Sequence, residues 1–134
     1  MAGVTDNLAA FLNARLDEDE RDARELLSAN AASRARGFAS TLWDEEDERA
    51  QRLLREVEAK RAILRQHHRL TPHPEYGFTY AAAGNFCGYC GPGDNWQAEQ
   101  EPDHYPGAMW PCQHVRLIAA VWSDHPDYRE EWKP

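Results

Sequence analysis

The residues of this 134-residue chain whose types and spacing could do chemistry are its three cysteines. Cys87 and Cys90 form a C-x-x-C pair inside the glycine-rich segment NFCGYCGPGDNW, and Cys112 follows in WPCQHVRLIAA, where a helix is expected to begin. Thiolates on a tight turn, combined with a thiolate at a helix start, are a common ligand set for tetrahedral zinc. Gly88 and Gly91 would allow the positive φ that such a turn can require. The sequence therefore predicts a zinc site.

A structural zinc site needs a fourth ligand, and two histidines are candidates by position. His114 is separated from Cys112 by a single residue, a spacing that suits the start of a helix better than its interior. His125 lies in the DHPDY segment after the same helix. Spacing alone does not choose between these two. The less favoured histidines are His67, His68, His73 and His104.

Other interpretations of the thiols are free buried cysteines, a redox pair and an iron–sulfur site. CGYC resembles a thioredoxin-type motif, but a glycine-rich loop follows it rather than a helix, and an iron–sulfur cluster usually takes four cysteines. Residues 84–112 have few apolar side chains to offset an ordering cost of ~1–2 kcal/mol per residue. A metal ion would supply that stabilisation, which favours the zinc interpretation.

Two long amphipathic helices are expected to precede the cysteines, over residues 5–30 and 44–68. Thr5 or Asp6 could cap the first, and residues 31–43 have the character of a connection anchored by Phe38 and Trp43. Each apolar stripe has one flaw. The first helix is interrupted at DEDERD, so that it either bends or projects beyond its partner there, and the second carries Arg61 on its apolar face. Two such helices pack most simply as an antiparallel hairpin.

The remaining chain predicts a smaller, turn-rich part. YGFTYAA at 76–82 could form a strand, 115–122 a short buried helix, and DHPDYREEW a final turn with Tyr128 and Trp132 on one face. The expected fold is mainly α, with an N-terminal antiparallel helical hairpin, a small zinc-stabilised loop or β-hairpin and short C-terminal helices. We expect a single domain over 1–134, with the hairpin in 1–70 and the cysteine-containing subdomain in 71–134.

Charge and hydropathy restrict the partners. The net charge is −8, the second half is the more acidic, and no basic stripe for binding nucleic acid is present. No apolar run approaches the ~20 residues that span a bilayer, and the N-terminus lacks the features of a signal peptide. The sequence thus predicts a cytoplasmic protein that binds another protein, with neither nucleic acid nor membrane as a direct partner.

Catalytic motifs are missing from the sequence: it has no phosphate-binding glycine loop, nucleophile elbow or H-E-x-x-H helix. The favoured function is a non-enzymatic interaction or regulatory protein that zinc stabilises. One alternative is an acidic decoy that occupies the surface of a nucleic-acid-binding protein. Another is a small zinc hydrolase, with His104, Asp103 or Glu101 as general base.

Three blocks, LAAFLNARLDEDERDAR, LLREVEAKRAIL and VRLIAAVWSDHPDYREEW, resemble a family of small actinobacterial and actinophage proteins of unknown function. The resemblance implies an actinobacterial or phage origin and hence the cytoplasm, and it brings no catalytic residues. His125 falls inside the family-like C-terminal block, whereas the resemblance implies other residues at the position of His114. The resemblance therefore favours His125 as the fourth ligand.

Overall fold

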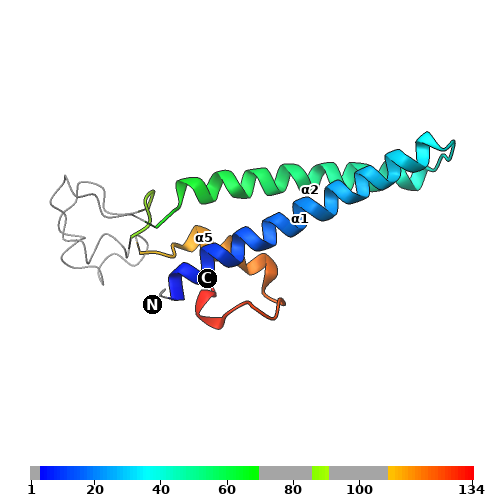
Figure 1. The fold of residues 1–134 in the computed structure, drawn as a ribbon. Helices are drawn as coiled ribbons and strands as arrows, with labels where there is room; N and C mark the ends of the chain where they lie inside the picture. Colours follow the sequence, from blue (N-terminus) through cyan, green and yellow to red (C-terminus); the bar gives the residue numbers. More distant parts are fainter. Residues whose placement is uncertain (1–3, 70–85, 91–108) are drawn as a thin grey trace. The chain divides into compact units, whose positions relative to one another are not determined.

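The computed structural model describes residues 4–69, 86–90 and 109–134. Within them the chain is mainly helical, and the expected N-terminal two-helix hairpin and short C-terminal helices are confirmed (Figure 1). These residues fall into two compact units: one is Leu12–Ala62, and the other combines the N-terminal residues up to Phe11 with Ile63–Pro134. That 1–134 is a single domain stays a prediction. The helical elements are α1 (Val4–Ala35), α2 (Thr41–Gln66), α5 (Gln113–Ala119), and the 3-10 turns η3 (Ala120–Trp122) and η4 (Glu130–Trp132).

Helix α1 begins at Val4, so Thr5 and Asp6 lie inside it rather than capping it, and it continues to Ala35, into the segment expected to be a connection. Gly37, two residues after the end of the helix, turns the chain away, and its φ of 91° belongs to the left-handed region. The amide of Gly37 donates to Arg34 O at 2.9 Å and that of Phe38 donates to Ser33 O at 3.2 Å, a pair of bonds that closes many helices. Phe38 is 61% exposed, so the prediction that it anchors a connection is wrong.

Helix α2 begins earlier than expected because Ser40 provides its first capping contact, accepting a hydrogen bond from the amide of Leu42 at 3.2 Å. Trp43 is half-buried in its first turn. In the unit Leu12–Ala62 the two helices bury the positions that the apolar pattern marks. These core residues are Leu12, Leu16, Ala23, Ala50 and Val57.

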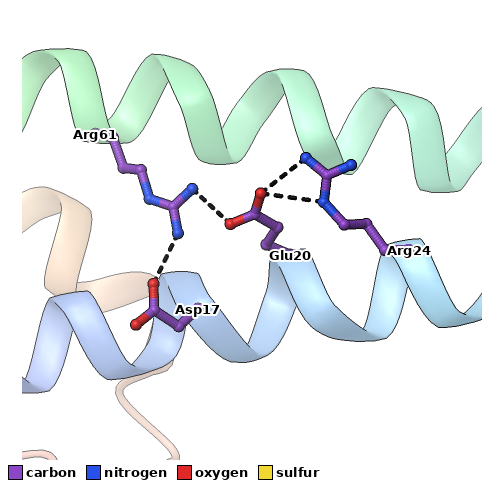
Figure 2. A network of polar contacts seen from close by, with 4 residues as sticks. All are labelled: Asp17, Glu20, Arg24 and Arg61. Carbon is purple, nitrogen blue, oxygen red and sulfur yellow. Dashed lines mark hydrogen bonds and ion pairs between the residues drawn. The ribbon is translucent and has the colours of Figure 1, made fainter.

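The charged residues that interrupt the two apolar stripes pair with one another across the hairpin. Arg61 of α2 donates to Glu20 Oε2 and to Asp17 Oδ1 of α1, both at 2.7 Å (Figure 2). Arg24 donates to the other oxygen of Glu20 at 2.9 and 3.1 Å. Hydrogen bonds from Arg61 and then Arg24 hold the pKa of Glu20 below its usual range. The acidic break in α1 therefore lies where its partner helix supplies a cation.

A second polar contact joins the helices near their connection. Asn30 and Arg34 of α1 donate to the two oxygens of Asp47 at 2.9 and 2.6 Å, and Arg34 also donates to Asp44 at 2.9 Å. Hydrogen bonds from Asn30 and Arg34 lower the pKa of Asp47. Polar contacts thus supplement the apolar core of the unit Leu12–Ala62.

The C-terminal segment packs on the start of α1. The rings of Trp132, His125 and Tyr128 lie 5.0, 5.6 and 6.2 Å from that of Phe11, and Trp132 is only 2% exposed. Tyr128 and Trp132 contact each other at 5.8 Å, although Arg129 between them is extended, so the contact does not arise from the helical spacing that was expected. The guanidinium of Arg116 donates to three carbonyl oxygens, which fixes the last residues to α5. Those carbonyls belong to Pro111, Glu131 and Lys133, at 3.0, 3.1 and 3.2 Å.

The expected β-hairpin is not seen among the described residues, and the proposed strand at 76–82 lies outside them. In its place are two isolated antiparallel bridges, Arg69 with Cys87 and Phe86 with Met109. The expected helix over 115–122 divides into α5 and η3, and Leu117 and Val121 are more than half exposed, so it is buried on one face only. None of the described helices has the length and apolarity to cross a bilayer.

Candidate metal centre

Three chain segments bring the cysteines together with a histidine. Cys87 and Cys90 lie on the turn 86–90, Cys112 immediately precedes α5, and His67 is the first residue after α2. The bridges at Cys87 and Phe86 join the turn to the other two segments. The amide of Gly88 also donates to the carbonyl of His68 at 2.6 Å. Backbone pairing therefore positions the four side chains before any ligand is considered.

The distances around His67 match a tetrahedral site. Its Nδ1 atom lies 3.5 Å from Cys87 Sγ, 3.3 Å from Cys90 Sγ and 3.5 Å from Cys112 Sγ. Zinc–sulfur bonds of about 2.3 Å and zinc–nitrogen bonds of about 2.0–2.1 Å at tetrahedral angles place a nitrogen about 3.6 Å from each sulfur. One imidazole nitrogen thus lies nearly equidistant from three sulfurs, at distances compatible with ligands that share one ion.

Burial makes this cluster unfavourable for thiolates unless a cation is present. Burial, followed by the neighbouring Cys112 and Cys87, raises the pKa of Cys90 to about 12. Burial is also the main cause that raises the pKa of Cys112, although the backbone amides of Val115 and His114 act in the opposite direction. A divalent cation reverses this balance, because a coordinating thiol is deprotonated outright.

The histidine is already in the form that binds a metal. His67 is 5% exposed, and burial, followed by the neighbouring His114, lowers its pKa. A neutral imidazole carries the lone pair that coordinates a metal. Three buried or half-buried thiols and a neutral imidazole therefore form a donor set typical of zinc.

The turn between the cysteines has the features of a knuckle. The amide of Cys90 donates to Cys87 Sγ at 3.5 Å. Gly88 does not have the expected positive φ, since Gly37 is the one glycine with that conformation among the described residues, and Gly91 lies outside them. Position 88 lies close to another side chain: a Cβ there would lie 2.8 Å from Cε1 and 2.9 Å from Nε2 of the exposed His68 ring, so the ring would have to shift.

A fifth donor lies beside this set. His114 Nδ1 is 3.6 Å from Cys90 Sγ, and its ring stacks on that of His67 with centroids 4.6 Å apart and planes at 28°. Ligand atoms of His67, Cys90, Cys112 and His114 all lie within 4.8 Å of one another. Of the predicted ligands, Cys90, Cys112 and His114 therefore belong to this group, whereas Cys87 is not part of it and approaches it through His67, at 3.5 Å from Nδ1.

The other predicted ligand, His125, lies elsewhere. Its ring packs on Phe11, and its Nδ1 accepts a hydrogen bond from the amide of Asp127 at 3.0 Å. His67 was among the less favoured histidines of the sequence. The one feature of the sequence that could have indicated His67 as a ligand is its position directly after a long helix, which can bring a side chain close to a segment distant in sequence.

The fold and the cluster define a mainly helical protein with a Cys/His group that could bind a metal ion. The chain belongs to a family of unknown function, DUF6221, whose model matches residues 5–134. No curated protein matches the chain significantly. No solved structure matches it significantly either.

Proposed function

We propose that Cys87, Cys90, Cys112 and His67 hold one zinc ion and that this ion has a structural role. The observation that carries the proposal is the near-equal distance, 3.3–3.5 Å, from His67 Nδ1 to the three sulfurs. Zinc fits better than harder cations because thiolates and imidazole are its usual ligands, whereas magnesium and calcium prefer oxygen.

A structural role follows from the number of protein ligands. A catalytic zinc keeps one position for water or substrate, whereas four protein ligands close the coordination sphere. The proposed set supplies four, and the Cys87 and Cys112 side chains are almost completely buried. This arrangement favours a structural centre over the hydrolase alternative.

The ion would join three separate segments of the chain. His67 follows α2, Cys87 and Cys90 lie on the turn 86–90, and Cys112 precedes α5, so one ion fixes the end of one helix to the start of another. We infer that the protein is a non-enzymatic interaction or regulatory protein of the cytoplasm, a compartment that keeps such thiols reduced. Its acidic character, a net charge of −8, favours a basic protein partner.

Elemental analysis of untagged protein tests the centre. We expect about one zinc per chain, lost in Cys87→Ser and in His67→Ala but retained in His114→Ala and His125→Ala. Cobalt substitution provides a second readout, because the intensity of the thiolate-to-cobalt charge-transfer bands reports how many sulfurs bind. Metal-free wild-type protein with thermal unfolding unaffected by a chelator would refute the proposal.

A further inference from the structure

The cluster contains one donor more than a tetrahedral ion requires. Cys87, Cys90, Cys112 and His67 account for four positions, yet His114 Nδ1 stands 3.6 Å from Cys90 Sγ. That distance equals the ligand-to-ligand spacing of about 3.6 Å expected between nitrogen and sulfur on a shared zinc ion. His114 is therefore close enough to bind the same ion after a small rotation.

Exposure differs sharply across the five donors. Cys87 and Cys112 are 0% and 1% exposed and His67 is buried, whereas Cys90 is half-buried and His114 is exposed. A hydrated ion that approaches from solvent therefore meets His114 and Cys90 first. The two buried sulfurs are closed to solvent, whereas this edge is open to it.

We propose that His114 is an exchangeable fifth donor through which zinc is taken up and released. This inference rests on the proposed zinc centre. During uptake, His114 Nδ1 and Cys90 Sγ would be the first protein donors to replace waters of the hydrated ion, and the Cys90 thiol proton would pass to solvent. Cys87 and Cys112 would then bind, each losing its proton to solvent, His67 would replace His114, and the remaining waters would leave. Release follows the same steps in reverse, with no change of oxidation state.

This role has a kinetic signature that separates it from permanent coordination. A group that binds the ion only along the path lowers the barrier equally in both directions, so its removal slows uptake and release by the same factor. The dissociation constant, which is the ratio of the two rates, then stays unchanged. Removal of a permanent ligand instead weakens equilibrium binding.

The test uses full-length, zinc-loaded protein and a chromogenic chelator. The release rate is measured at several chelator concentrations and extrapolated to zero, which removes direct attack by the chelator. Competition with the same chelator gives the dissociation constant, and the two quantities give the uptake rate. The variants are His114→Ala, His114→Asp as a rescue that restores a donor atom, and Gln113→Ala as an exposed neighbour on the same helix.

We expect His114→Ala to slow release and uptake by about tenfold each, the factor that corresponds to the loss of about 1.4 kcal/mol of stabilisation at the barrier, with an unchanged dissociation constant. His114→Asp should restore much of the rate, and Gln113→Ala should behave as wild type. Unchanged rates in His114→Ala would overturn the inference, as would weakened equilibrium binding, which would make His114 a permanent ligand. Wild-type protein without zinc would instead refute the centre itself.

Discussion

The close approach of Gly88 to His68 gives the sharpest test of how the centre is built. A methyl group at position 88 would lie 2.8 Å from Cε1 and 2.9 Å from Nε2 of the His68 ring. Carbon contacts in proteins are optimal at about 3.5–4.0 Å, so the ring must move by about 0.7 Å or more. Two contacts restrain that movement: His68 Nδ1 is 3.0 Å from Arg65 O, and the His68 carbonyl accepts the Gly88 amide.

A shift of His68 is transmitted to the metal centre because the adjacent residue is His67. His68 is exposed, so its ring can turn aside at the cost of a strained rotamer, about 0.5–1.5 kcal/mol, which corresponds to roughly a 2- to 13-fold change in an equilibrium constant. We therefore expect Gly88→Ala to weaken zinc binding by a factor in that range. Competition with a chelator measures this factor, and the melting temperature with and without zinc gives an independent value.

The double variant decides whether the clash is the cause. His68 is exposed, so His68→Ala alone should change zinc affinity little. Gly88→Ala combined with His68→Ala removes the obstructing ring and should recover most of the lost affinity, a coupling of about 0.5–1.5 kcal/mol. If the double variant binds zinc as weakly as Gly88→Ala does, the steric argument is wrong and the glycine serves another purpose.

Three further predictions concern the helical framework. Phe11→Ala should destabilise the protein by about 3–5 kcal/mol, seen as a lower midpoint of denaturation and a changed emission of the adjacent Trp132; a cost below about 1 kcal/mol would contradict the packing. Arg61→Met should lower the melting temperature. The double variant Arg61→Met/Glu20→Gln should lose less free energy of unfolding than the sum of the two single variants, whereas strict additivity would show that the two side chains are not coupled. The pKa of Asp47 is lowered from 3.8, so the stability that ionised Asp47 contributes is complete above pH 3.8 and is lost as the pH falls through its folded-state pKa. Asp47→Asn should therefore flatten this part of the plot of stability against pH, and an unchanged slope would contradict the role of Asp47.

The apolar periodicity predicted both long helices but not the bounds of the connection between them. The pattern around Leu12, Leu16 and Val57 is strong enough to set the buried faces. The segment after residue 30 is weakly periodic, so its helical continuation to Ala35 could not be separated from a loop. What ends the helix is Gly37, through a left-handed backbone and two return hydrogen bonds, and its distance from the last apolar position hid that role.

The two flaws in the stripes show how a local pattern can mislead when the explanation is a long-range one. An acidic run in one helix and Arg61 in the other each weaken amphipathicity when each helix is considered alone. Once the register of the hairpin places Arg61 opposite Asp17 and Glu20, both flaws become one contact. A sequence-based search for the register could therefore seek opposite charges at the interrupted positions as well as matched apolar residues.

The ligand set illustrates the same limit in the metal centre. Spacing identified the three cysteines because two of them share a short turn, whereas a histidine can join from any segment that the fold brings near. His114 was found because it is close to Cys112 in sequence, and its exposure assigns it to the edge of the cluster. His67 is buried and nearly equidistant from all three sulfurs, although 20 residues separate it from Cys87. Burial and distance, neither of which spacing encodes, are the properties that make His67 the better fourth ligand.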